Sequence, residues 1–292
     1  MPKTLVNVHG RTATPEFNHR LNQLMQAVFG FSFQRFQGLD VWDEDYEYFG
    51  FVDDGELIAN VGVYHMMLVM QGRERKVLQI GAVATAESRR LQGLARQLFE
   101  EVLQRYPDVP MYLYGGDDVT AFYDKFGFRT AVENQPYICD AAGNVPGGYR
   151  SSGRCIPLAL TDPKVDQYLQ RRAVFSEILD CTNPYAVNWF HLAYNYSDSI
   201  YEMSQDRGLA IFQKEGSVLR LLDLVLPQPL AFAELCQELP LRGITRLEFG
   251  FTPDFLLETY DVKPYVEADC NFMVKGWSPE DVGGFLPRLT RT

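Results

Sequence analysis

Residues 83–95 read VATAESRRLQGLA, and this stretch says more about the fold than any other part of the 292-residue chain. It begins inside a nearly continuous apolar run over residues 77–85, which is typical of a strand near the middle of a sheet. It leads into residues 89–106, where apolar residues recur at the spacing of an amphipathic helix. The stretch therefore predicts a buried strand that turns directly into a helix.

The turn carries an Arg-x-x-Gly-x-Ala pattern, made by Arg90, Gly93 and Ala95. Small residues let a ligand approach the backbone closely, and N–H groups at a helix N-terminus attract anions. Arg89 and Arg90 add positive charge at the same place. The pattern alone is a weak signal, but a buried strand before it and a helix after it are what a diphosphate-binding turn requires.

A second pattern follows, in which residues 121–128 read AFYDKFGF after a short predicted strand and two glycines. Both patterns resemble motifs of the GCN5-related N-acetyltransferase (GNAT) superfamily. The first is similar to its acyl-CoA-binding motif, and VAT followed by R-x-x-G-L-A resembles the enhanced-intracellular-survival branch. The second is similar to its short-helix signature of an apolar residue, Tyr, two variable residues, an apolar residue, Gly and an aromatic. The resemblance covers residues 1–140 well and residues 155–292 only in the order of elements.

The resemblance implies an acetyl-CoA site in which backbone groups of Val83 and Thr85 bind the pantetheine and orient the thioester, while residues 90–95 wrap the pyrophosphate. The implied cofactor-binding residues are Val83, Ala84, Thr85, Arg90, Leu91, Gln92, Gly93, Leu94 and Ala95. It also implies that Tyr123 donates a proton to the departing CoA thiolate. A phenol, with an ordinary pKa of about 10, is protonated at neutral pH and can act as an acid. The competing interpretation of Tyr123 is a core aromatic on a short helix.

The motif departs from the family pattern at three positions: Glu87 replaces the usual Pro, Ala95 replaces the second Gly, and Leu91 stands where Gly is common. These changes bear on affinity more than on the mode of binding. The sequence does not identify a general base. The candidates are Asp43, Glu44, Asp45 and Glu47 in an acidic-aromatic stretch, and His65 on a predicted strand. A solvated loop and a structural sheet histidine are the competing interpretations, and water could serve instead of any side chain.

The periodicity predicts an α/β protein. The resemblance implies an acetyltransferase-type mixed central sheet flanked by helices, followed by a second, degenerate acetyltransferase-like α/β domain. Helices are expected over residues 14–29, 89–106, 119–126, 162–179, 183–192, 230–239 and 253–259. Strands are expected over residues 46–53, 57–70, 77–85, 111–114, 200–204, 209–214, 218–225, 245–251 and 271–275. The two halves show a similar order of elements, which indicates a diverged duplication.

Residues 140–153 read DAAGNVPGGYRSSG and lose hydrophobic periodicity. We therefore predict a catalytic domain over residues 1–140, a linker over residues 141–154 and the second domain over residues 155–292. A long surface loop within one domain is the alternative. In the second half, Pro227 and Pro229 follow the strand over residues 218–225 and remove N–H donors that a diphosphate site needs. The second domain is therefore expected to have lost cofactor binding.

Composition excludes several classes of function. The net charge is −11 with no basic stripe, which disfavours nucleic acid as a partner. No apolar run approaches the roughly 20 residues of a membrane span, and no secretory signal precedes residue 17, so we expect a cytoplasmic protein that does not bind membranes. The five cysteines and four histidines are scattered without metal-ligand spacing, so no metal is expected. A homo-oligomer stays open.

The sequence thus predicts an acetyl-CoA-dependent N-acetyltransferase that acts on a small-molecule or peptide amine by direct attack in a ternary complex. No Ser or Cys stands out as a nucleophile for a covalent intermediate. A non-catalytic acyl-CoA-binding sensor or interaction protein is the main alternative, and an O-acyl or long-chain acyl transferase is a weaker one.

Overall fold

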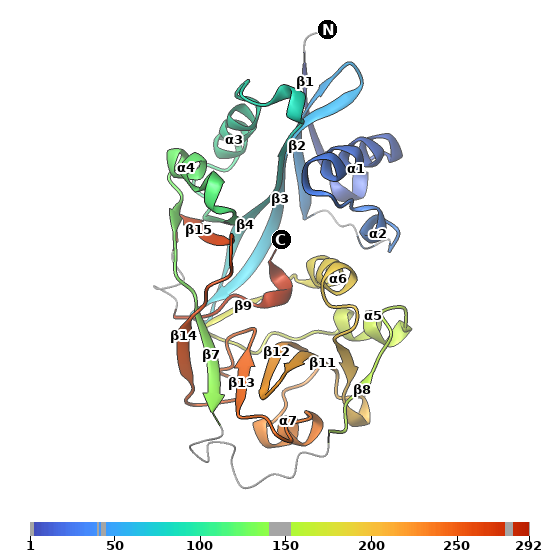
Figure 1. The fold of residues 1–292 in the computed structure, drawn as a ribbon, viewed down its shortest axis with the longest axis vertical. Helices are drawn as coiled ribbons and strands as arrows, with labels where there is room; N and C mark the ends of the chain where they lie inside the picture. Colours follow the sequence, from blue (N-terminus) through green and yellow to red (C-terminus); the bar gives the residue numbers. More distant parts are fainter. Residues whose placement is uncertain (1–2, 40, 42–44, 140–152, 278–282, 292) are drawn as a thin grey trace.

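The structure is a computed structural model, and it describes residues 3–39, 41, 45–139, 153–277 and 283–291. Within these residues the strands form two mixed sheets, with helices packed on their faces (Figure 1). The predicted α/β class is confirmed. No helix in the described part of the chain has both the length and the apolar character needed to cross a membrane.

The first sheet has the strand order β1-β2-β3-β4-β5-β15-β6, and β9 pairs with β3. Its strands are β1 (Thr4–His9), β2 (Tyr46–Asp53), β3 (Glu56–Met70), β4 (Arg73–Thr85), β5 (Met111–Gly115), β6 (Arg129–Thr130), β9 (Leu179–Cys181) and β15 (Asn271–Lys275). Its described pairs are antiparallel except β4 with β5, which run parallel. A parallel pair requires a crossover, and the α3 segment supplies it.

The second sheet has the order β14-β7-β13-β12-β11-β10-β8. Its strands are β7 (Asn134–Cys139), β8 (Ile156–Pro157), β10 (Ile200–Glu202), β11 (Leu209–Glu215), β12 (Val218–Val225), β13 (Arg246–Phe249) and β14 (Asp261–Pro264). Here β12 and β13 form the parallel pair. The parallel pair therefore recurs in both sheets, in keeping with the similar order of elements in the two halves.

The two sheets exchange one strand. β7 follows the elements of the first half but lies between β13 and β14, whereas β15 follows those of the second half but lies between β5 and β6. In each sheet the exchanged strand is next to the second member of the parallel pair. The predicted strand over residues 271–275 is thus present, but in the first sheet. The proposed linker over residues 141–154 falls mostly outside the described residues, and the domain division stays a prediction.

Helices cover both faces of the first sheet (Figure 1). One face carries α1 (Pro15–Phe29), α2 (Gln34–Gln37) and α6 (Tyr185–Tyr194), and the other carries α3 (Leu94–Arg105) and α4 (Thr120–Tyr123). α5 (Pro163–Gln170) packs beside α6, and α7 (Phe232–Glu238) covers the second sheet. The 3-10 turns are η1 (Gly10–Thr12), η2 (Glu87–Arg89), η3 (Asp117–Val119), η4 (Asp124–Phe126), η7 (Ser204–Asp206) and η8 (Arg288–Thr290).

α1 begins where the sequence predicts, because the Thr14 hydroxyl accepts a 3.1 Å hydrogen bond from the Phe17 N–H and caps the helix. Two other helix predictions are wrong. The helix expected over residues 162–179 ends at Gln170, since the chain then places Arg172 against Asp180 at 2.9 Å in a buried ion pair. Residues 253–259 form turns instead of a helix, and the Asp254 carboxylate accepts the Glu177 N–H at 2.9 Å from another segment.

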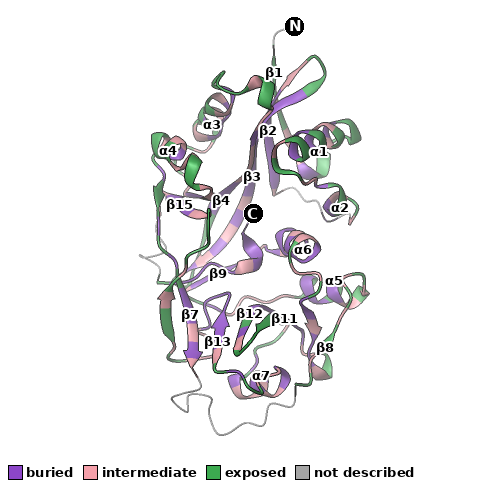
Figure 2. Cartoon of the chain, viewed as in Figure 1, coloured by how far each residue is buried: buried purple, intermediate pink, exposed green. Residues whose placement is uncertain are grey.

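The core consists of three clusters of buried apolar side chains, and the central strands of both sheets are largely buried (Figure 2). The cluster on the α1 and α6 face includes Val77 of the first sheet and Ile211 of the second, so the sheets share one core. The C-terminal segment runs between them, where the Arg288 N–H donates to the Gly250 carbonyl at 2.7 Å and Leu289 is fully buried. This packing holds the first sheet in place around the site described next.

Candidate active site

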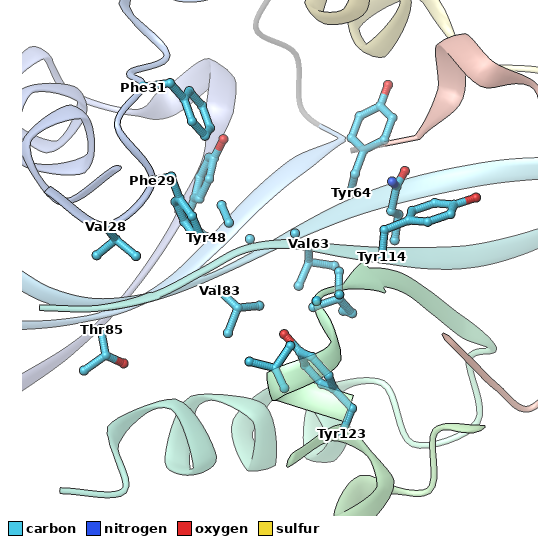
Figure 3. Close-up of a pocket in the computed structure, with 18 of the residues that line it drawn as sticks. Val28, Phe29, Phe31, Tyr48, Val63, Tyr64, Val83, Thr85, Tyr114 and Tyr123 are labelled. Atoms are coloured by element: carbon cyan, nitrogen blue, oxygen red, sulfur yellow. The ribbon is translucent and has the colours of Figure 1, made fainter. Parts of the chain in front are cut away.

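A cleft opens where β4 and β5 separate. The two strands pair from Leu78 with Met111 to Ile80 with Leu113, and beyond this point β4 continues to Thr85 without β5 beside it. The cleft has a volume of about 790 Å³ and is lined from both faces of the sheet (Figure 3). A split parallel pair exposes backbone groups that a continuous sheet would pair, so it offers hydrogen bonds to a ligand.

β4 is distorted at the mouth of this split. The register with β3 shifts between Asn60 and Gly62, and Ala82 takes a φ of +49°. The Asn60 side-chain amide donates to the Ala82 carbonyl at 3.0 Å and holds the distortion. A Cβ at Gly62 would lie 3.0 Å from the Gly81 carbonyl oxygen, so the glycine leaves room for it. Such bulges terminate regular pairing and turn backbone groups toward a site.

The turn after β4 differs from the predicted helix start. α3 begins at Leu94 instead of residue 89, because Leu91 and Gly93 have φ values of +63° and +73°, which a helix cannot contain. The first-turn N–H groups of α3 have no partners within the helix. They follow directly on a turn whose Leu91 side chain is fully exposed. A helix N-terminus of this kind attracts anions, and the diphosphate site over residues 90–95 stays a prediction.

The predicted site residues divide into two groups. Val83, Thr85, Arg90 and Tyr123 all line the cleft, although Tyr123 is distant from the other three in sequence. The other predicted cofactor residues are not part of the cleft lining. Ala84 and Leu94 are buried, Ala95 is partly buried, and Leu91, Gln92 and Gly93 are exposed. The exposed turn lies beside the cleft, and of its residues Arg90 lines the cleft.

The two arginines of the turn are not equivalent. The Arg89 guanidinium lies 2.8 Å from the Asp53 carboxylate, so its charge is already balanced. Arg90 is exposed at the cleft and has no ion-pair partner among the residues that the structure describes. The positive charge at this turn that no carboxylate balances therefore comes from Arg90 and the helix N-terminus.

Tyr123 is held rigidly in the cleft. Its ring is 6% exposed and packs 5.5 Å from the Phe99 ring of α3, and Figure 3 shows its hydroxyl pointing toward β4. Burial, with the Asp118 carboxylate adding to it, raises the pKa of Tyr123 to about 12. The phenol is thus fully protonated at neutral pH and can donate a proton into the cleft.

The general-base candidates described by the structure point elsewhere. The fully buried Glu47 carboxylate accepts from Tyr106 at 2.6 Å and lies 2.9 Å from the His65 ring. Burial opposes its ionisation, but hydrogen bonds from His65, Tyr106 and Asn7 outweigh burial and lower the pKa of Glu47 to about 2. Asp45 accepts from the Asn183 amide at 2.8 Å. Asp43 and Glu44 lie outside the described residues.

The sequence reasoning missed much of the cleft wall. The lining also contains aromatic residues on the α1 and α6 face of the sheet and two carboxylates beyond β5: Phe29, Phe31, Phe33, Tyr46, Tyr48, Tyr64, Phe190, Asp118 and Asp269. One signal was available, because the alternation in residues 46–48 puts Tyr46 and Tyr48 on the face opposite Glu47. No local pattern connects α6 or residue 269 with this site.

In the second sheet, β12 and β13 also separate beyond their parallel pairing, but side chains fill the space between them. β12 and β13 pair in parallel up to Leu221 with Phe249, and the register of β12 with β11 shifts just after Leu221. The space beyond holds only about 10 Å³. The buried Arg172 side chain fills it and lies 3.7 Å from the Asp223 carboxylate. Among the residues that the structure describes, only the split in the first sheet is therefore open.

The comparisons define the class of protein to which this fold and cleft belong. Residues 9–131 match the acetyltransferase (GNAT) domain model. The matched range includes β4, its bulge, the turn before α3 and Tyr123. The predicted family is therefore confirmed, and the match supports acyl transfer as the general activity. No curated protein matches the chain.

Solved structures with a similar fold span nearly the whole chain. A probable N-acyltransferase from Enterococcus faecalis V583 has 16% identity and a TM-score of 0.58, covering 94% of this chain and 72% of that one. A GCN5-related N-acetyltransferase from Anabaena variabilis has 17% identity and a TM-score of 0.57, with coverage of 93% and 72%. Eis1 from Mycobacterium abscessus has 13% identity and a TM-score of 0.56, with coverage of 93% and 73%. At these identities the likeness shows the fold alone.

Proposed function

We propose that the protein transfers an acetyl group from acetyl-CoA to an amine acceptor by direct attack within a ternary complex. The observation that carries this proposal is the cleft between β4 and β5, where Val83, Thr85 and Arg90 line the same cavity as Tyr123. A cofactor strand, a cationic turn and a protonated phenol are the groups that this reaction needs. The acceptor is a small molecule or a peptide.

In this proposal acetyl-CoA supplies the activated acetyl group. Backbone groups of Val83 and Thr85 orient its thioester, which the bulge at Ala82 supports by turning the chain toward the cleft. Arg90 and the N–H groups of Gln92, Gly93, Leu94 and Ala95 hold the diphosphate. Positioning both substrates in one cleft supplies the proximity that lowers the barrier.

The proton balance follows from the side chains that face the cleft. A nitrogen–carbon bond forms and the carbon–sulfur bond breaks, and the Tyr123 hydroxyl donates its proton to the departing sulfur. Tyr123 then recovers a proton from solvent. The amine must lose its own proton, and since Glu47 and His65 contact each other outside the cleft lining, we assign that proton to water. The GNAT match favours this activity over an acyl-CoA sensor.

Calorimetric titration with acetyl-CoA tests the cofactor site. We expect the wild-type protein to bind acetyl-CoA with a micromolar Kd, which corresponds to a standard binding free energy of about −8 kcal/mol. Gly93→Glu should abolish binding, because it places a carboxylate at the diphosphate and a side chain at a φ of +73°. Gly216→Glu is a matched control, since Gly216 also has a positive φ of +58° and open surroundings but lies in the β11–β12 turn. Equal binding by both variants would refute the assignment of residues 90–95.

A further inference from the structure

The half of the cleft on the α1 and α6 face is walled by aromatic rings. Six of them come from four different elements or their connections: Phe29, Phe31, Phe33, Tyr48, Tyr64 and Phe190. The four phenylalanine rings form a chain of contacts, with centroids 6.1 Å apart for Phe29 and Phe31, 5.3 Å for Phe31 and Phe33 and 6.0 Å for Phe33 and Phe190. Figure 3 shows Phe29, Phe31 and Tyr48 grouped on one side of β4. An apolar, ring-lined surface of this kind binds flat apolar groups.

The end of α1 is shaped to present these rings. Gly30 ends the helix with a φ of +74°, and no atom lies within 4 Å of where its Cβ would be. The chain therefore turns sharply between Phe29 and Phe31 and directs both rings to the cleft. Phe29 is 47% exposed, which is unusual for so large an apolar side chain unless it meets a ligand or partner.

The aromatic wall and the cofactor groups lie on opposite faces of the sheet. Tyr123 packs in the cluster under α3, whereas Tyr48, Tyr64 and Phe33 belong to the cluster on the α1 and α6 face. The cleft connects the faces through the split between β4 and β5. With the diphosphate at the start of α3, the acetyl group reaches the split from the α3 side. An acetyl group has only two carbons and is too small to cover the aromatic rings on the other side of the split. The second substrate must therefore cover these rings.

The charges in the cleft also constrain this substrate. Asp118 and Asp269 line it, and both carboxylates come within 3.0 Å of the position that a Cβ at Gly116 would take. Neither has an ion-pair partner within the described part of the chain, so they attract an ammonium group. Further charges on the same acceptor would have to lose water against aromatic rings, which is costly. One positive charge on an apolar body fits this distribution; several do not.

We infer that the acceptor is a primary amine carried on an aromatic group of about the size of an arylethylamine, bound with its ring among Phe29, Phe31 and Tyr48. This inference rests on the proposed acetyl transfer and adds the chemical class of the acceptor.

Steady-state acetylation of 2-phenylethylamine, tryptamine, n-butylamine and spermidine by the full chain tests it. We expect kcat/KM for the two arylethylamines to exceed the other values by about tenfold or more, as buried aromatic area contributes. Phe29→Ala and Phe31→Ala should each raise KM for 2-phenylethylamine by about tenfold while leaving the Kd for acetyl-CoA unchanged. Phe29 is half-exposed, so its variant should fold normally. Ile156→Ala, at a 57% exposed site on β8, is the control. It should change neither the KM for 2-phenylethylamine nor the Kd for acetyl-CoA.

Calorimetry separates the two ways in which this inference can fail. If wild-type protein does not bind acetyl-CoA, the proposed function fails and the inference falls with it. If acetyl-CoA binds but spermidine is acetylated as well as the arylethylamines, or no arylethylamine is acetylated, only the acceptor class is overturned. It is also overturned if octanoyl-CoA is preferred to acetyl-CoA and Phe31→Ala removes that preference, since the rings would then hold an acyl chain.

Discussion

Tyr123 shows how a residue's surroundings decide what it can do. Packing against Phe99 and the nearby Asp118 carboxylate raise its pKa to about 12, so the hydroxyl keeps its proton at every pH below that value. The raised pKa also makes the phenol a weaker acid, so its suitability as a donor rests on its position in the cleft. The same burial keeps the ring in one orientation toward the cleft.

Replacing Tyr123 with Phe should lower kcat by about 100-fold, the usual contribution of a positioned general acid. The Kd for acetyl-CoA should stay within about twofold, because the ring is retained. Stopped-assay kinetics and calorimetry on the same preparation measure both values. Phe122→Leu provides a comparison on the same helix, and an unchanged kcat in Tyr123→Phe would remove the tyrosine from the mechanism.

At the scale of elements, Glu47 ties together four segments on the α3 face. Its carboxylate accepts from Asn7 of β1 at 2.9 Å and Tyr106 after α3 at 2.6 Å, and lies 2.9 Å from His65 of β3. These contacts hold β2 in register while Tyr46 and Tyr48 face the cleft on its other side. Glu47 therefore supports the cleft from behind, and it does not line the cleft.

Glu47→Gln should reduce the free energy of unfolding by about 2–3 kcal/mol at pH 7, since the neutral amide loses charge-assisted hydrogen bonds. The folded-state pKa of about 2 lies below the ordinary 4.5. The carboxylate thus stabilises the fold above pH 4.5, and this contribution is lost as pH falls from 4.5 to 2. Thermal unfolding of the wild type and of Glu47→Gln should show that their difference in free energy of unfolding becomes smaller as the pH falls from 4.5 to 2. A constant difference would show that ionisation of Glu47 does not contribute.

At the scale of the whole molecule, the exchange of β7 and β15 makes each sheet depend on the other half of the chain. β15 pairs with both β5 and β6, so its removal would leave the β5 edge unpaired next to the cleft. The buried C-terminal segment and the shared core reinforce this dependence. The cleft between β4 and β5 is therefore a property of the full fold.

A fragment of residues 1–139 should not bind acetyl-CoA or unfold cooperatively, because it lacks β15 and exposes β7. The full chain should unfold in one calorimetric transition, as a single packed unit does. Co-expression of residues 1–139 with residues 153–292 is the control, and it should restore binding if the fragments reassemble. Cooperative unfolding and acetyl-CoA binding by the first fragment alone would show that its sheet closes without the exchanged strand.

The sequence by itself determined the β4–turn–α3 unit and the short helix with Tyr123. In both, the deciding residues lie within about 15 positions of one another, so hydrophobic periodicity and glycine positions report them directly. It placed the start of α3 five residues too early, because side-chain periodicity does not reveal the positive φ of Leu91. It also predicted a helix over residues 171–178 that a buried ion pair of Arg172 replaces.

Only the tertiary structure decided which sheet β7 and β15 join, and which side chains face the cleft beside Tyr123. Phe31, Phe190 and Asp269 meet at one cavity although the intervals between them are about 160 and 80 residues. Such contacts arise from the packing of helices and strands on a shared core, and no local pattern encodes them. The motif at residues 83–95 is therefore readable from the sequence, whereas the aromatic wall of the cleft is a consequence of the fold.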